Sequence, residues 1–172
     1  MKIFVLLADR GTPNPGVGTL DLLNAGWSIT SLVPGPGVGQ LASTGPFITP
    51  PHVVAVFYEL EQNYLNRPIE LVIELLTEDG QAVQLPGPAG LQPMRMQTTI
   101  NVPSPGGVPI GTPGTGNSMI EVFPGLPLAV GAYIWRATLA GKQDEAGEAR
   151  FNVRPAAVAP RAQFGTPAPE GS

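Results

Sequence analysis

The chain has no cysteine and a single histidine, His52, which limits the kinds of site it can build. Without cysteine it forms no disulfide and offers no thiolate to a metal. Any Ser-His-Asp triad or histidine-based metal site would have to use His52. That residue opens an apolar stretch directly after two prolines, and we expect a lone histidine in such a place to be structural. The sequence therefore predicts no catalytic residues, no metal site and no cofactor.

Charge is also scarce, because charged residues make up 13% of the 172 positions where roughly 25% is usual. The formal net charge is −4, and the nine Lys and Arg residues are scattered, so there is no basic stripe for a nucleic acid. The apolar run from Ile3 to Ala8 stops at Asp9, which is too short for a signal peptide. No stretch approaches the ~20 apolar residues of a membrane span. We expect a soluble protein made in the cytoplasm, with neither nucleic acid nor membrane as partner.

Glycine and proline are abundant, with 22 and 21 residues, and they separate short stretches of alternating polarity. Alternation with period two is typical of half-buried strands. In residues 94–102 the pattern places Met94, Met96, Thr98, Ile100 and Val102 on one face. Strands are predicted at residues 2–8, 20–23, 27–33, 52–60, 69–76, 82–85, 94–102, 119–123, 132–139 and 149–153. No helix longer than a turn is expected, although residues 56–65 are ambiguous.

Two local patterns sharpen the prediction of the fold. Asp79-Gly80 follows the strand at residues 69–76 and supplies the positive φ of a hairpin turn. Gly131-Ala132-Tyr133 resembles a tyrosine corner, in which the phenol bonds back to an upstream backbone group. The last two strands are expected to pair around residues 140–147. Together the patterns predict an all-β, antiparallel immunoglobulin-like β-sandwich of about eight or nine strands in residues 1–154.

Three Gly/Pro-rich segments, at residues 34–51, 86–93 and 103–117, are predicted to be loops. The first and third are longer than a connection requires, so they are either contact loops or mobile insertions. Residues 155–172 are predicted to form an extended or disordered Pro/Ala-rich tail. None of the glycine-rich segments has the Lys-Ser/Thr of a phosphate-binding loop.

The carboxylates and the tryptophans of the sequence are also predicted to have structural roles. Glu70 and Glu74 share a strand face, but four residues along a strand span ~13 Å, which exceeds the usual separation of a glycosidase pair. The acidic residues 144, 145 and 148 lack the ligand spacing of a calcium loop. Trp27 and Trp135 lie on alternating stretches and are predicted to be core residues.

Four segments resemble a family of small uncharacterised proteins of bacteria and their phages, the DUF6941-like family. They are Leu-Leu-Ala-Asp at residues 6–9, Asn-Ala-Gly-Trp-Ser-Ile-Thr at 24–30, Glu-Leu-Leu-Thr-Glu-Asp-Gly at 74–80 and Gly-Ala-Tyr-Ile-Trp-Arg at 131–136. The resemblance covers roughly residues 2–154 and implies a fold but no catalytic residues. The longer Gly/Pro loops of this chain depart from the family pattern.

These observations favour a non-enzymatic structural or interaction module. A phage origin, which only the resemblance implies, would make it a capsid decoration or accessory protein of the virion. Its partner would then be a capsid or other virion protein, and a homo-oligomer is also open. The alternative is a β-sandwich that binds a glycan or small molecule through tryptophan or tyrosine side chains outside the core. An enzyme is the third hypothesis, since the sequence contains no catalytic motif.

Overall fold

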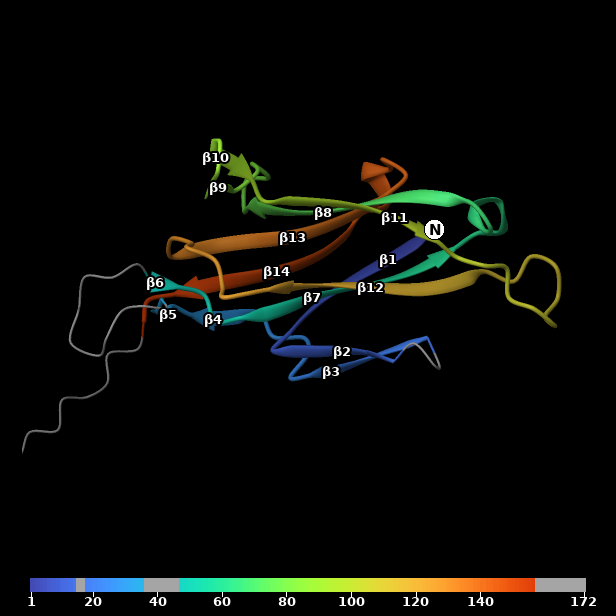
Figure 1. The fold of residues 1–172 in the computed structure, drawn as a ribbon, viewed down its shortest axis with the longest axis horizontal. Helices are drawn as coiled ribbons and strands as arrows, with labels where there is room; N and C mark the ends of the chain where they lie inside the picture. The colour runs from blue at the N-terminus through green and yellow to red at the C-terminus, as the bar shows by residue number, and fades with distance from the viewer. Residues whose placement is uncertain (15–17, 36–46, 157–172) are drawn as a thin grey trace, which may run out of the picture.

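A computed structural model of the chain describes residues 1–14, 18–35 and 47–156 and is almost entirely β-structure (Figure 1). The strands are β1 (Lys2–Ala8), β2 (Arg10–Asn14), β3 (Thr19–Leu23), β4 (Ile29–Ser31), β5 (Val33–Pro34), β6 (Phe47–Ile48), β7 (His52–Leu60), β8 (Pro68–Thr77), β9 (Gln84–Gly87), β10 (Gly90–Pro93), β11 (Arg95–Asn101), β12 (Gly114–Val122), β13 (Gly131–Leu139) and β14 (Gly147–Arg154). Two single 3-10 turns, η1 (Gln62–Tyr64) and η2 (Gln143–Glu145), complete the described elements.

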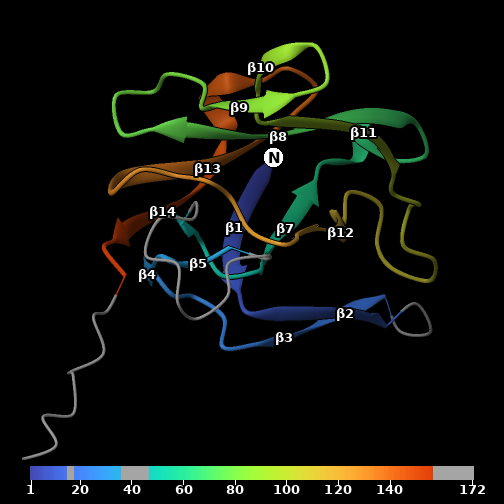
Figure 2. The same cartoon turned by 60° about the vertical axis from the view of Figure 1, so that its left-hand side comes forward.

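Two sheets enclose the core. The first has the strand order β1-β7-β12 and is antiparallel throughout. The second has the order β11-β8-β13-β14-β4, in which only the short β4 runs parallel to its neighbour, β14. Hairpins β2–β3, β9–β10 and β5–β6 lie outside these two sheets (Figure 2).

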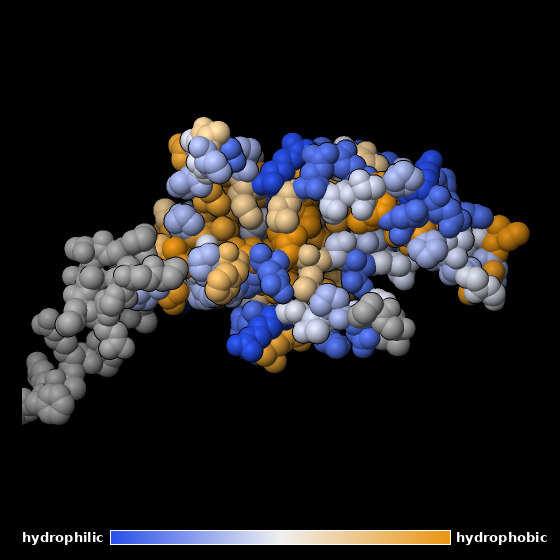
Figure 3. Space-filling view, viewed as in Figure 1, coloured by the Kyte–Doolittle hydropathy of each residue, from blue (hydrophilic) through white to orange (hydrophobic). Residues whose placement is uncertain are grey.

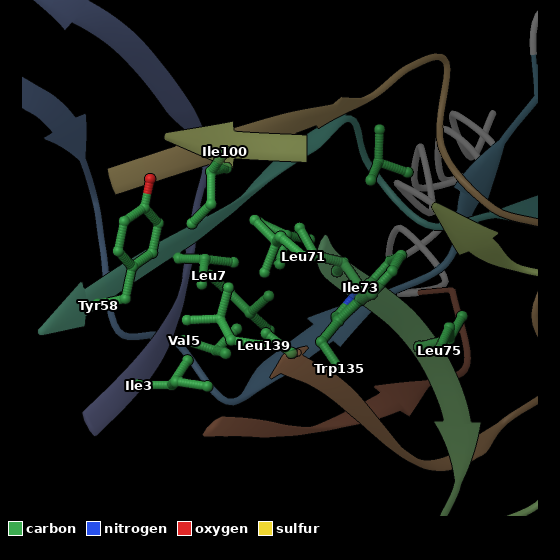
Figure 4. Packing of buried hydrophobic residues seen from close by; sticks show 14 of the residues in the cluster. Ile3, Val5, Leu7, Tyr58, Leu71, Ile73, Leu75, Ile100, Trp135 and Leu139 are labelled. Carbon is green, nitrogen blue, oxygen red and sulfur yellow. The ribbon is translucent and has the colours of Figure 1, made fainter. Parts of the chain in front are cut away.

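Alternating side chains explain why the two sheets pack together. In β1 the residues Ile3, Val5 and Leu7 are buried while Lys2 and Phe4 are exposed, because neighbouring side chains point to opposite faces of a strand. Figure 4 shows how buried side chains from β1, β7, β8 and β13 meet. The largest fully buried residues are Trp135, Phe151, Leu7, Leu60, Leu71, Leu75 and Leu139.

Strand β7 is buried on both faces, because hairpin β2–β3 covers part of its outer face (Figure 1). Val53 and Ala55 point away from the core and are nevertheless 4% and 0% exposed. Gly11 of β2 lies so close that a Cβ on it would be 3.0 Å from the Met119 sulfur and 3.2 Å from a Val53 methyl. A glycine at this position lets the hairpin lie directly on the sheet.

Strand β1 closes one side of the core by approaching β14. Gly147, the first residue of β14, is buried, and a Cβ on it would lie 2.9 Å from the carbonyl oxygen of Ile3. Only glycine permits this approach of the two backbones.

Several predictions from the sequence are confirmed. The chain forms antiparallel β-sheets without a helix longer than a turn in the described residues. The turn after β8 contains Gly80 with φ 83°, and β13 pairs with β14 as expected. The phenol of Tyr133 donates a hydrogen bond to the Ala129 carbonyl at 3.0 Å, as predicted for a tyrosine corner. Trp135 is 0% exposed and lies in the core.

Other predictions are wrong. The predicted loop at residues 86–93 belongs to hairpin β9–β10, because Gly90 with φ 105° allows a tight reversal between the prolines. Strand β12 begins at Gly114 rather than Met119. The ambiguous segment 56–65 is the end of β7 followed by η1, so it contains no helix longer than a turn, as expected. Of the 14 strand segments in the described residues, eight form the two sheets that enclose the core and six form the three hairpins outside them.

The predicted inner face of β11 is only partly buried. Ile100 is 8% exposed as expected, but Met96 is 43% exposed and Thr98 is also exposed. The reason is that β11 is an edge strand of its sheet, as β12 is of the other. Figure 3 shows an apolar band open to solvent between these two edges. The predicted tail and most of the first long loop lie outside the described residues.

Replacing Gly147 with alanine should destabilise the fold by about 1–3 kcal/mol, because the new methyl group would overlap the Ile3 backbone. Urea unfolding followed by tryptophan fluorescence measures the change in the free energy of unfolding. Gly106→Ala is the matched control, since nothing lies within 4 Å of a Cβ at that position. Equal stabilities of the two variants would contradict the close approach of β1 and β14.

Candidate functional site

The carboxylates considered in the sequence are engaged in ion pairs or lie on a solvent-facing surface. Glu148 contacts Arg136 at 2.8 Å, and Glu145 contacts Lys142 at 2.9 Å. Glu70 is exposed on the outer face of β8. No group of three His, Cys, Asp or Glu residues within the described ranges could hold a metal ion, and no described helix is long and apolar enough to cross a membrane.

A cleft of about 450 Å³ lies on the outer face of the β1-β7-β12 sheet. Phe4 of β1, Phe57 of β7 and Leu20 of β3 supply its apolar walls, and we name it the phenylalanine cleft after them. Phe4 is 60% exposed, and both Phe57 and Leu20 are half-buried. Apolar side chains of this size are usually buried, so two neighbouring phenylalanines open to solvent mark a surface that can bind.

Strand register places the two phenylalanines together. Phe4 lies directly opposite Phe57 in the β1–β7 pair, and both point away from the core. Hairpin β2–β3 covers the neighbouring part of the same face and stops beside the cleft. Its position there is fixed by Asn117, whose side-chain amide donates to the Gly18 carbonyl at 2.9 Å.

A second candidate lies at the end of the core where β7 begins. Two cavities of about 230 and 370 Å³ share Asp9, Pro51 and His52 in their walls. Trp27 lines the smaller cavity, and Phe123, which is 81% exposed, lines the larger. We call the two cavities together the His52 pocket.

Backbone hydrogen bonds join the loop that carries Trp27 to β1 and to β14. Gly26 donates its backbone N–H to Leu7 at 2.8 Å, and the Ser28 carbonyl accepts from Asn152 of β14 at 2.9 Å. Positive φ angles at Asn24 (50°) and Gly26 (84°) turn the chain sharply between these anchors. Trp27 is thereby held against the core with part of its ring exposed. The prediction that Trp27 is a core residue is therefore only partly correct, because it packs against the core but is only half-buried.

His52 is buried among aromatic rings. Its ring centre lies 5.6 Å from that of Trp27 and 6.4 Å from that of Trp135, in edge-to-face arrangements. Its Nδ1 is 3.0 Å from the Pro50 carbonyl oxygen. A carbonyl only accepts, so Nδ1 carries the hydrogen and Nε2 of the neutral ring is an acceptor. Burial lowers the pKa of His52, against the smaller opposing effects of the Pro50 carbonyl and the Asp9 carboxylate.

Sequence reasoning placed His52 at a strand end but missed both hollows. The signal for the phenylalanine cleft is present, since Phe4 and Leu6 alternate with the core residues of β1 and must point outward. The His52 pocket has no such signal, because Asp9, Trp27 and His52 are brought together only by the tertiary fold.

No family model matches the chain, and no curated protein matches it.

The lowered pKa of His52 predicts that stability depends on pH just below neutrality. An unfolded histidine has a pKa of about 6.5, so below that pH the unfolded chain binds a proton that the folded chain binds less readily. Stability should be full above about pH 6.5 and should fall as the pH drops toward the folded pKa. Urea midpoints at about pH 7.5 and about pH 5.5 measure this loss.

His52→Phe keeps an aromatic ring at the site and should remove most of the pH dependence in that window. The chain has one histidine, so its imidazole signals give the folded pKa directly by NMR. Titration at or above the unfolded value would contradict the effect of burial.

Proposed function

We propose that this chain is a non-catalytic interaction module, built on an immunoglobulin-like β-sandwich, that binds a protein partner through the phenylalanine cleft. The single observation that carries the proposal is the pair of outward-facing phenylalanines in the walls of this cleft. The hydrogen bond of the tyrosine corner supports the immunoglobulin-like part of the proposal.

The walls of the cleft favour an apolar side chain of the partner. Among its described lining residues only Glu59 is charged, and the Lys2 ammonium lies 3.2 Å from its carboxylate. The cleft therefore offers apolar contact area with little net charge, as the centre of a protein interface does. Thr115 and Asn117 at the edge supply hydrogen-bonding groups for the rim.

A virion protein is the partner that the resemblance to phage proteins favours. In that role the module would be a capsid decoration or accessory protein that binds the particle through protein–protein contacts and catalyses no reaction. Exposed apolar residues on the loop between β11 and β12, Val108 (45%) and Ile110 (93%), offer a further contact. This loop lies at the end of the molecule where β12 begins (Figure 1).

A photo-crosslinking amino acid in place of Phe4 tests the cleft. Crosslinking should join this position to one protein at a fixed copy number in purified particles of the source phage, or in extracts if the protein is cellular. The same amino acid at Leu91, which is 71% exposed on β10, is the control and should give little product. Mass spectrometry identifies the partner.

Phe4→Gln should reduce retention on that partner at least about tenfold, the effect expected on losing a central aromatic contact, whereas Leu91→Gln should leave it unchanged. Equal crosslinking at positions 4 and 91 would overturn the proposal. A crosslinked product made of two copies of this chain would contradict binding of a separate partner protein and would assign the cleft to a homodimer interface.

A further inference from the structure

The Trp27 loop, residues 24–28 between β3 and β4, is attached to the core by a single side chain. Every residue from 23 to 29 is exposed except Trp27, which is half-buried. The Trp27 indole packs edge-to-face against two rings, with centre-to-centre distances of 5.6 Å to His52 and 6.0 Å to Phe151. Segments with few buried contacts open locally at a lower free-energy cost than the core. The loop is therefore expected to open without unfolding of the sheets.

The other residues around His52 belong to the centre of the fold. His52 begins β7, the middle strand of its sheet, and Trp135 lies on β13, the middle strand of the second sheet. The segment before His52 is fixed at Thr49, whose N–H donates to the Leu126 carbonyl at 2.9 Å and whose hydroxyl accepts the Leu126 N–H at 3.0 Å. A rearrangement at His52 is therefore taken up most easily by the Trp27 loop.

The closed pocket has no place for a second proton on His52. Nδ1 already carries the hydrogen that it donates to the Pro50 carbonyl, so an added proton goes to Nε2. That atom is buried and has no hydrogen-bond partner within the described part of the chain. A buried charged donor without an acceptor is far less stable than the same group in water. Protonation therefore favours a state in which water reaches Nε2.

Few charged groups line the cavities beside this histidine. Asp9, between β1 and β2, lies in the walls of both cavities, whereas Arg10 of β2 and Glu121 of β12 lie in the wall of the larger one. The aromatic rings packed against His52 carry no charge. Burial lowers the pKa of His52 more than its backbone carbonyl partner and the Asp9 carboxylate raise it. The neutral ring is thus the form that the closed pocket accepts.

We propose that His52 is a pH-sensitive switch for the Trp27 loop: the neutral ring keeps the loop closed over the end of the core, and protonation releases the loop while the two sheets stay folded. The open loop exposes the Trp27 indole and the His52 pocket to solvent. This local opening precedes the global loss of stability at low pH. It depends neither on the phenylalanine cleft nor on the proposed protein partner.

The pH range of the opening follows from proton linkage. In the open loop His52 is in water and has the ordinary pKa of about 6.5, whereas in the closed loop burial lowers that pKa. Between the two pKa values, each unit of decrease in pH raises the ratio of open to closed molecules about tenfold. The loop is therefore closed at neutral pH and opens progressively as the pH falls below about 6.5.

Fluorine NMR of the full chain labelled with 5-fluorotryptophan tests the switch, because the chain has two tryptophans. Trp27→Phe removes one of the two signals and so assigns them. As the pH is lowered from about 7.5, a neutral gadolinium chelate in the solvent should broaden the Trp27 signal increasingly, in step with the titration of the His52 imidazole signals. The signal of Trp135, which is 0% exposed, reports on the folded core and should stay narrow.

Asp9→Asn and Glu121→Gln are a matched pair, because each removes one carboxylate from the pocket wall. Asp9→Asn keeps an oxygen for the Asn24 amide and should move the midpoint to lower pH, since the Asp9 carboxylate raises the pKa of His52. Glu121→Gln should leave the midpoint unchanged. His52→Phe should keep the Trp27 signal narrow throughout. If that variant does not fold, agreement between the imidazole and Trp27 midpoints in the unaltered chain decides the question.

Three outcomes would overturn the switch. Simultaneous broadening of the Trp27 and Trp135 signals would mean that the chain unfolds as a whole. Titration of the His52 ring without any change at Trp27 would mean that the loop does not respond to the proton. Broadening of the Trp27 signal that persists in His52→Phe would assign the opening to another group.

Discussion

The whole structure depends on the burial of large apolar side chains between the inner faces of β7 and β13. Trp135 is 0% and Phe151 1% exposed, and each aromatic side chain of this kind buries about 150–250 Å². At about 25 cal/mol per Å², one such ring contributes on the order of 4–6 kcal/mol of transfer free energy. In a chain without disulfides or described metal ligands, this burial is what orders the sheets.

Both candidate sites result from this packing of the two sheets. The alternation that directs Ile3 and Val5 inward directs Phe4 outward, and the sheet then presents Phe4 beside Phe57. His52 is the first residue of β7 and lies at the end of the core where the aromatic cluster meets the polar residues of the loops. One face thus exposes aromatic surface, and one end of the core buries polar atoms.

The sequence was most informative where a strand is long and one of its faces is buried. Strand β1 matches its predicted limits, since the alternation of buried and exposed residues is visible in residues 2–8. Strand β7, which is buried on both faces, also matches its predicted limits because its residues are mostly apolar. It was least informative for β2, β9 and β10, which contain prolines and lie outside the two sheets, where packing imposes no periodicity. The pocket around His52 could not be predicted from the sequence, because its walls come from segments that are distant in sequence.

The anchoring of the Trp27 loop has a consequence for the order in which the protein matures during synthesis. Its Ser28 carbonyl binds Asn152, and the adjacent β4 pairs with residues 152–154. A nascent chain emerges N-terminus first, so residue 27 leaves the ribosome long before the strand that fixes it. The His52 pocket is therefore among the last features to be completed, and a chain shortened before β14 would lack it even though every residue lining the pocket had been made.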